Sequence, residues 1–278
     1  MVQNTVICTS GRISPVQYQP LLKMVVSMDR WVGKVAVVTG ASTGIGAAIA
    51  KQLVSNGLIV VGIARRLELI QQLAQELADR KGKLHAYKGD VSKEDDIVKA
   101  FKWIEENLGP VHILINNAGV AKETTLIEGD AEAWRSVLEV NVLGLCVATR
   151  EAIRSMKRHD VKGHIVHINS LCGHRVPNFP GMNIYPASKH AVTALTETLR
   201  QELNFIGAKI KVTSVSPGLV TTEMTTLNKN LDPEKKAIVE KFPALETEDI
   251  ADGVIYVLST PEHVQVHELT IKPVGEMY

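Results

Sequence analysis

Cysteine is scarce in this 278-residue chain, which contains only Cys8, Cys146 and Cys172. An odd number of cysteines with no C-x-x-C spacing indicates neither a disulfide framework nor a cysteine zinc site. We expect Cys172 to be a buried, unreactive thiol, because the sequence shows no histidine that would activate it. The sequence predicts no other metal site, and unpaired cysteines are typical of a reducing compartment. We therefore expect a cytoplasmic protein.

An excess of either charge is also lacking, since 31 basic and 30 acidic residues give a formal net charge of +1. Aromatic residues make up only 4% of the chain. Nucleic-acid binding typically needs a basic stripe with aromatic residues among the cations, so we expect no nucleic-acid partner. No apolar stretch approaches the ~18 residues that a membrane-spanning helix needs, so the sequence predicts a soluble protein without a membrane span.

Aspartate and glutamate are absent from the first 27 positions. Lys23 interrupts the only apolar cluster there, 21–26, whereas a secretory signal needs an unbroken apolar run of about seven residues. The basic residues leave a mitochondrial presequence open, although prolines oppose the amphipathic helix that it would need. We expect residues 1–28 to be a disordered extension, or a mispredicted one with Met28 as the true start. Residues 29–278 are predicted to form a single domain.

From Gly33 onward, short apolar runs alternate with longer segments of helical periodicity. This alternation predicts an α/β fold, a doubly wound, Rossmann-like parallel sheet of about seven strands with helices on both faces. The expected strands are 35–38, 58–63, 83–87, 111–115, 163–168, 209–215 and 267–271, and the expected helices lie near 44–55, 66–80, 93–108, 130–157, 184–206 and 247–258.

A glycine-rich turn follows the first expected strand. Gly40, Gly44 and Gly46 precede a helix-like segment, and such glycines allow the backbone to turn tightly and to approach a ligand. The free N–H groups at a helix start favour a pyrophosphate. The spacing departs from the G-x-G-x-x-G dinucleotide pattern, and a glycine turn without a ligand is the alternative at this point.

Tyr185 and Lys189 are four residues apart, so a helix would place them on one face. Pro186 fits the first turn of such a helix because it lacks a backbone donor. A free tyrosine titrates near pH ~10, and an adjacent ammonium favours the phenolate, so such a pair can transfer protons at neutral pH. Taken alone, the spacing is more typical of a solvated surface pair.

Together these motifs resemble the short-chain dehydrogenase/reductase family over residues 30–275. The motifs that carry the resemblance are Gly40/Gly44/Gly46, Asn116-Asn117-Ala118-Gly119, and Tyr185 with Lys189, in the family's order. Ser170 matches the family's catalytic serine, and Asn141 matches its helix asparagine. The resemblance implies that Tyr185 exchanges the proton of the substrate oxygen while Ser170 holds that oxygen. It further implies that Lys189 lowers the tyrosine pKa and binds the nicotinamide ribose, and that Asn141 anchors a water.

The resemblance also implies a bound dinucleotide. Ala64 stands where an acid would select NAD, and Arg65 or Arg66 offers a partner for a 2′-phosphate, so we expect NADP(H). The arginines would otherwise begin a solvated helix, and the paired asparagines would otherwise cap a turn. The expected cofactor contacts are Gly40, Ser42, Thr43, Gly44, Ile45, Gly46, Arg65, Arg66, Asp90, Val91, Asn117, Ala118, Gly119, Tyr185, Lys189, Pro217, Gly218, Val220 and Thr222.

The segment 218–245 resembles the family's substrate-binding loop. Its apolar residues, which are Leu219, Val220, Met224, Leu227, Leu231 and Phe242, favour a small apolar alcohol or ketone, although a loop packing on itself would look similar. The segments 28–42 and 60–66 resemble a farnesol-dehydrogenase-like subgroup of the family, which implies NADP-dependent work on an isoprenoid alcohol such as farnesol, or on a ketosteroid. The alternatives are a reductase of other carbonyl substrates and a catalytically idle dinucleotide sensor.

Two remaining features concern assembly and metal binding. The long helices near 130–157 and 184–206 resemble those through which family members pair, which implies a homodimer or homotetramer. His164 and His167 are three residues apart in an expected strand, so they face opposite sides and cannot chelate one ion. Packing or surface roles are expected for both histidines.

Overall fold

A seven-stranded parallel sheet organises the protein, for which the computed structural model describes residues 26–178, 181–226 and 242–276. The strand order is β3-β2-β1-β4-β5-β6-β7, and each pair of neighbours is parallel. The strands are β1 (Val35–Thr39), β2 (Ile59–Ala64), β3 (Lys83–Lys88), β4 (Val111–Asn116), β5 (His164–Ile168), β6 (Lys211–Pro217) and β7 (Glu268–Ile271). The predicted doubly wound sheet is confirmed.

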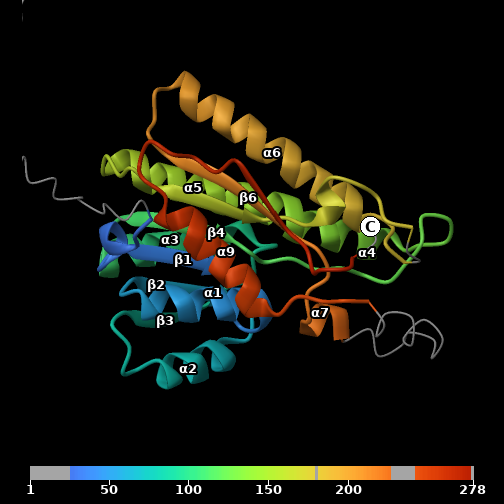
Figure 1. Ribbon diagram of the computed structural model, residues 1–278, viewed down its shortest axis with the longest axis horizontal. Helices are drawn as coiled ribbons and strands as arrows, with labels where there is room; N and C mark the ends of the chain where they lie inside the picture. Colours follow the sequence, from blue (N-terminus) through green and yellow to red (C-terminus); the bar gives the residue numbers. More distant parts are fainter. Residues whose placement is uncertain (1–25, 179–180, 227–241, 277–278) are drawn as a thin grey trace, which may run out of the picture.

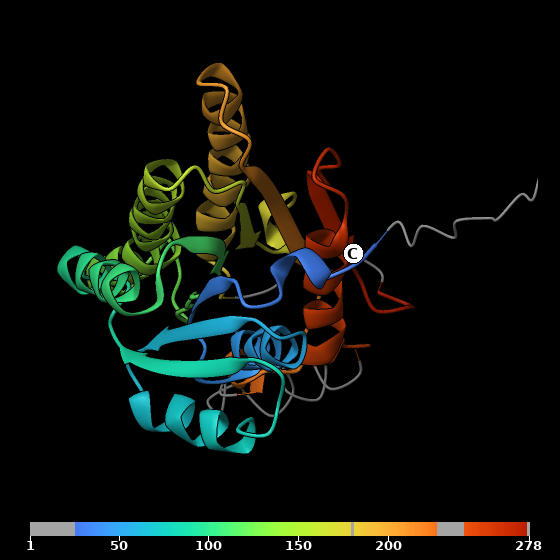
Figure 2. The same cartoon turned by 90° about the vertical axis from the view of Figure 1, so that its left-hand side faces the viewer.

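Two layers of helices cover the sheet (Figures 1 and 2). The helices are α1 (Gly44–Ser55), α2 (Leu67–Glu76), α3 (Glu94–Leu108), α4 (Ala131–Leu138), α5 (Leu145–Arg158), α6 (Tyr185–Phe205), α7 (Glu223–Thr226) and α9 (Thr247–Ser259). One core packs α1, α2 and α9 on the sheet, and the other packs α3, α5 and α6. Neighbouring residues of β1 alternate between these cores, with Ala36 and Val38 in the first and Val35 and Val37 in the second. Burial on both faces explains why the central strands β1, β2 and β4 are nearly continuous apolar runs.

The long helix expected over 130–157 is interrupted. The π-helical segment η2 (Glu139–Gly144) separates α4 from α5 and contains Asn141. Gly144 packs closely there, because a Cβ atom at this position would overlap the main-chain carbonyl of Val91. Apolar periodicity at a 3.6-residue spacing gives no signal for a wider turn, and such turns are frequent at functional sites.

The N-terminal part of the described chain packs against the C-terminal end of α9. Met28 is buried in the first core, and Trp31 of the short 3-10 helix η1 (Asp29–Trp31) donates from Nε1 to the Leu258 carbonyl at 2.8 Å. Residues 1–25 of the extension expected over 1–28 lie outside the described residues. Met28, by contrast, belongs to the folded part. In the described ranges no helix has the length and apolar character that crossing a bilayer requires.

Candidate active site

A cavity of about 800 Å³ opens at the carboxyl ends of the strands. Residues that follow all seven strands line it, from Gly40 after β1 to Glu276 after β7. Parallel α/β sheets bind ligands at this edge. Every expected cofactor contact except Gly46 and Lys189 lines the cavity, as do Ser170 and Tyr185. The structure therefore brings together residues from seven separate segments of the sequence.

The glycine turn forms the floor of one end of the cavity. Gly40 and Gly44 have φ angles of 69° and 59°, in the left-handed region that favours glycine. Gly46 lies behind the turn, where a Cβ atom would overlap the Gly40 carbonyl and the Asn117 amide. The side chain of Thr43 makes no capping bond to the first turn of α1, so backbone N–H groups there stay free for an anion. This arrangement fits a dinucleotide pyrophosphate.

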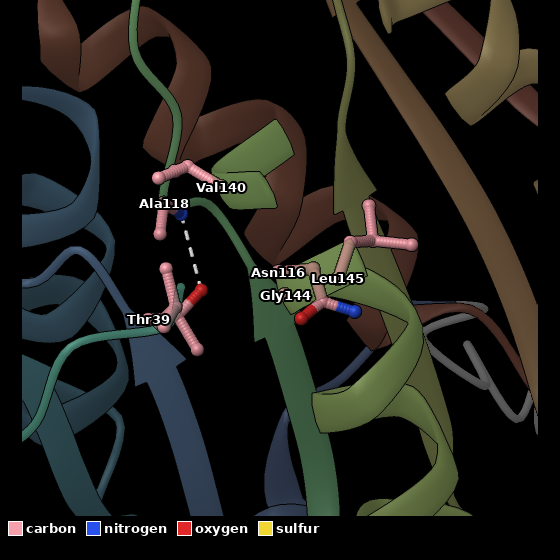
Figure 3. A pocket seen from close by; sticks show the side chains of 7 residues that line it. Thr39, Asn116, Ala118, Val140, Gly144 and Leu145 are labelled. Carbon is pink, nitrogen blue, oxygen red and sulfur yellow. Dashed lines mark hydrogen bonds between the residues drawn. The ribbon is translucent and has the colours of Figure 1, made fainter. Parts of the chain in front are cut away.

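Asn117 and Thr39 fix the glycine turn to the neighbouring strand β4. The amide of Asn117 donates from Nδ2 to the carbonyls of Thr39 (3.0 Å) and Gly40 (3.2 Å). The Thr39 hydroxyl accepts the backbone N–H groups of Asn117 and Ala118, both at 3.1 Å. Figure 3 shows the Thr39–Ala118 bond beside a small cavity that Asn116, Val140, Gly144 and Leu145 also line. Thr39 is a positioning residue that the sequence reading missed, although its place at a strand end before the glycines was a usable signal.

Arg66 reaches across the mouth of the glycine turn. Its guanidinium donates to the hydroxyls of Thr43 (2.9 Å) and Ser42 (3.3 Å) and to the Glu223 carboxylate (2.9 Å). Arg65 also lines the cavity, and no acidic side chain stands at Ala64. These cations suit the 2′-phosphate of NADP(H), because a guanidinium binds phosphate through several donors.

Asp90 lies at the carboxyl end of β3. Burial raises the pKa of its carboxyl. Hydrogen bonds from the Ser92 hydroxyl (2.7 Å) and the Ser92 N–H (3.0 Å) lower the pKa, as do the nearby charges of Arg65 and Lys93, and these effects together outweigh burial. The net result is a lowered pKa, so Asp90 carries its charge at neutral pH. Its acceptor oxygens are held in place at the cavity wall, next to Val91.

Ser170 and Tyr185 meet at the other end of the cavity. Ser170 caps the 3-10 helix η3 (Leu171–Gly173), its hydroxyl accepting the Cys172 N–H at 3.1 Å, and Tyr185 opens α6. Burial raises the pKa of the Tyr185 phenol, the nearby Cys172 thiol adds to the rise, and a hydrogen bond with Ser170 lowers it. The phenol is therefore a proton donor at neutral pH, whereas the sequence predicted a lowered pKa.

Lys189 lies one helical turn beyond Tyr185 but does not line the cavity. Its ammonium, 5.8 Å from the centre of the tyrosine ring, donates to the Ile168 carbonyl at 2.9 Å. Burial lowers the pKa of Lys189 to about 8. The pKa of the phenol is raised and not lowered as the sequence predicted, because burial favours the neutral form of each group.

Asn141 is buried beneath the cavity wall in the π-helical segment. Its Oδ1 accepts the Val120 N–H at 2.8 Å, and its Nδ2 donates to the Val120 carbonyl and the Ser188 hydroxyl, both at 3.0 Å. The side chain therefore ties the strand-end segment after β4 to α6, directly behind Gly119. These bonds support the shape of the site, while the expected water contact stays a prediction.

Both histidines of β5 are buried and hydrogen-bonded. His164 pairs with the Thr213 hydroxyl at 2.8 Å, and His167 pairs with Thr196 at 2.9 Å. Burial lowers the pKa of His164 well below its ordinary value and that of His167 to about 3, so both are neutral. The expectation of packing roles is confirmed, and the surface alternative is wrong. Cys172 is buried beside Ser170, and burial raises the pKa of its thiol.

Apolar side chains form a large part of the cavity lining. Leu219, Val220, Met224 and Phe242 of the expected substrate loop contribute, whereas Leu227 and Leu231 lie outside the described residues. Four charged residues that the sequence did not predict also line the cavity: Lys122, Arg175, Glu223 and Glu276. Arg175 and Glu276 form an ion pair at 3.5 Å although they are 101 positions apart, so no local pattern could join them.

The family model for short chain dehydrogenases matches residues 34–232. This match covers the glycine turn, the asparagine pair, Ser170 and the tyrosine–lysine pair, and the fold and cavity agree with it. The chain belongs to the short-chain dehydrogenase family, and it is an oxidoreductase.

Particular relatives are similar over most of the chain. A farnesol dehydrogenase of Aedes aegypti is 56% identical over 254 residues, which are 90% of this chain and the whole of that protein. The dehydrogenase/reductase SDR family member 11 of Bos taurus is 46% identical, again over 90% of this chain and all of that protein.

Solved structures include two similar chains with a bound dinucleotide. A closed form of serine dehydrogenase complexed with NADP+ has a TM-score of 0.79 at 30% identity, over 88% of this chain and 96% of its own. An alcohol dehydrogenase from the archaeon Thermococcus sibiricus, complexed with 5-hydroxy-NADP, has a TM-score of 0.75 at 30% identity, over 87% and 97%.

Proposed function

We propose that the protein is an NADP(H)-dependent dehydrogenase of apolar alcohols or ketones, with farnesol or a related isoprenoid alcohol as the first candidate and a ketosteroid as the second. The observation that carries the proposal is one cavity with the glycine turn and Arg66 at one end and Ser170 with Tyr185 at the other. When bound, the nicotinamide supplies or accepts the hydride. The 56% identity to a farnesol dehydrogenase supports the choice of farnesol.

The catalytic roles in this proposal belong to four side chains. Tyr185 gives its proton to the substrate oxygen during reduction and takes it back during oxidation. Ser170 donates a hydrogen bond to that oxygen and so stabilises charge that develops on it. The Lys189 ammonium lies close enough to the phenol to favour the loss of its proton, and it offers a donor to the nicotinamide ribose. Asn141 holds the strand-end segment that forms the wall beside the cofactor.

The cofactor contacts proposed are those that line the cavity, with Gly46 acting from behind the turn. The nicotinamide half would be contacted by Pro217, which ends β6, and by Gly218, Val220 and Thr222, which follow it. Asp90 and Val91 would contact the adenine. Arg65 and Arg66 would bind the 2′-phosphate, so NADP(H) is preferred over NAD(H).

The remaining proposals concern the whole chain. Residues 29–278 form one domain that acts in the cytoplasm and associates into a homodimer or homotetramer. In the described part of the chain, no three or more acidic, histidine or cysteine side chains are grouped so that they could hold a metal ion.

Absorbance of the reduced nicotinamide tests the function directly. Purified protein is assayed with NADP⁺ and farnesol, with NADPH and farnesal, and with ketosteroids and short-chain carbonyls as comparison substrates. Turnover that is greatest for farnesol or farnesal supports the proposal. Turnover of only the short-chain carbonyls would assign a different reductase, and cofactor binding without turnover would assign a dinucleotide sensor.

The cofactor preference is tested by the ratio of kcat/KM values for NADP⁺ and NAD⁺. A charge-assisted hydrogen bond contributes roughly 1.5–3 kcal/mol, so we expect NADP⁺ to be favoured about ten- to a hundredfold. The double variant Ala64→Asp/Arg65→Ala should reverse or abolish the preference, because an acid repels the phosphate and binds a ribose hydroxyl. Equal or NAD-favouring values in the wild type would refute this part of the proposal.

A further inference from the structure

Glu223 binds Arg66, the arginine to which the proposed function assigns the 2′-phosphate of the cofactor. Its Oε2 atom accepts hydrogen bonds from the Thr43 hydroxyl at 3.0 Å and from the Arg66 guanidinium at 2.9 Å. The same guanidinium also donates to Ser42 at 3.3 Å. A carboxylate oxygen thus already binds the Arg66 guanidinium and the Thr43 hydroxyl, two groups in this part of the cavity that could bind a phosphate.

The position of Glu223 is set by the fold and not by a neighbouring residue of the glycine turn. Glu223 opens α7 and is 157 positions from Arg66 in the sequence. Thr222, the preceding residue, packs over the turn, because a Cβ atom on Gly44 would lie 3.6 Å from its Cγ2. The backbone at the start of α7 therefore holds the carboxylate over the turn.

The negative charge of Glu223 would repel a phosphate bound to Arg66. Arg66 carries one positive charge, and a hydrogen bond from it lowers the pKa of the Glu223 carboxyl, so the acid is ionised at neutral pH. A 2′-phosphate placed on Arg66 would meet this second anion at contact distance. A ribose 2′-hydroxyl has no such conflict, because it can donate a hydrogen bond to a carboxylate.

We propose that Glu223 is a determinant of cofactor preference, which competes with the 2′-phosphate of NADP(H) for Arg66 and Thr43 and accepts a hydrogen bond from the 2′-hydroxyl of NAD(H). Glu223 thus has the role that an acid at the end of β2 would have in an NAD-preferring enzyme. It reduces the preference for NADP(H) that Arg65 and Arg66 create. This inference rests on the proposed binding of a nicotinamide dinucleotide.

Dissociation constants for NADPH and NADH, measured by the fluorescence of the reduced nicotinamide, test the inference without catalysis. Glu223→Gln keeps the size of the side chain and removes its charge. The ion pair is about half exposed and is screened by water, so the expected gain in NADPH affinity is roughly two- to fivefold. NADH affinity should stay equal or fall. Glu223→Asp, whose carboxylate is one methylene further away, should give a smaller gain in NADPH affinity.

Glu68→Gln is the matched control, because Glu68 is an exposed acid in the first turn of α2, two residues from Arg66. It makes the same change in net charge, and we expect it to leave the ratio of the two dissociation constants unchanged. Adenosine 2′,5′-bisphosphate and adenosine 5′-monophosphate are used as probes of the same effect, and only the bisphosphate should bind more tightly to Glu223→Gln.

The results separate this inference from the proposed function. An unchanged NADPH to NADH ratio in Glu223→Gln, or an equal shift in Glu68→Gln, overturns the role of Glu223. A wild type that prefers NADH, together with a Glu223→Gln variant that shifts toward NADPH, supports the role of Glu223 and rejects the preference proposed for the wild type.

Discussion

At the scale of single residues, Tyr185 is the proton donor on which the proposed chemistry depends. We expect Tyr185→Phe to reduce kcat for farnesol oxidation by about 10²–10⁴-fold, the usual worth of general acid–base catalysis. The NADPH dissociation constant should stay nearly unchanged, because the variant removes only the hydroxyl. Steady-state kinetics and fluorescence binding measure the two effects, and a near wild-type rate would reject the assignment.

The pKa of Lys189, lowered to about 8, predicts how carbonyl reduction depends on pH. Below pH 8 the ammonium is charged and the buried phenol of Tyr185 is protonated, which is the state that reduction requires. Above pH 8 the lysine loses its charge, so kcat/KM for the reduction of farnesal by NADPH should be flat below pH 8 and fall above it. A profile over pH 6–10 measures this decline.

Lys189→Arg provides the control for the pH profile, because a guanidinium stays charged over this range. Its rate should be lower at every pH, but the decline near pH 8 should disappear. A decline of the same size in the variant would assign the pH dependence to another group.

Most of the site residues predicted from the sequence lie at one cavity, because chemistry fixes their type and spacing. Gly40, Gly44 and Gly46 are required by a tight turn, and Tyr185 and Lys189 are required one helical turn apart. The sequence did not reveal Glu223 or Glu276, whose partners are distant in the chain. It also gave the wrong direction for the pKa of Tyr185, because desolvation depends on the packing around α6 and not on the spacing of two residues.

At the scale of helices and strands, Lys211 joins the start of β6 to the segment between α9 and β7. Its ammonium donates to the Thr260 hydroxyl and to the Val264 carbonyl, both at 2.8 Å. Lys211→Met would remove the ammonium that donates to both groups, so we expect the free energy of unfolding to fall by about 1–3 kcal/mol. Urea unfolding measures the loss, and Lys209→Met, an exposed lysine two residues earlier, should change it by less than about 0.5 kcal/mol.

The strands and most helices follow from the alternation of apolar runs with helical segments, since the central strands β1, β2, β4, β5 and β6 are buried on both faces. The interruption at η2 does not follow from it. In this wider turn the Asn141 side chain forms hydrogen bonds with Val120 and Ser188, and Gly144 packs against the Val91 main chain. Both reasons depend on tertiary contacts.

At the scale of the whole molecule, self-association is the remaining expectation. Leu143 in η2 and Phe205 at the end of α6 are 59% and 92% exposed in a single chain. Apolar side chains on these helices suit an interface between copies. Light scattering at micromolar concentration should show a dimer or tetramer, and a monomer would contradict the proposal. Leu143→Glu should weaken the assembly, whereas Val32→Glu, at a similarly exposed apolar residue outside these helices, should leave it unchanged.

The bonds between Thr39 and Asn117 have a consequence for the order in which the protein folds. The glycine turn is held by a residue 78 positions later in the chain, and β1 pairs with β4 in the middle of the sheet. A nascent chain or proteolytic fragment that ends before residue 117 contains every glycine of the turn but lacks the amide that fixes it. During refolding, dinucleotide binding should therefore appear only after β1 has paired with β4, and not before this pairing.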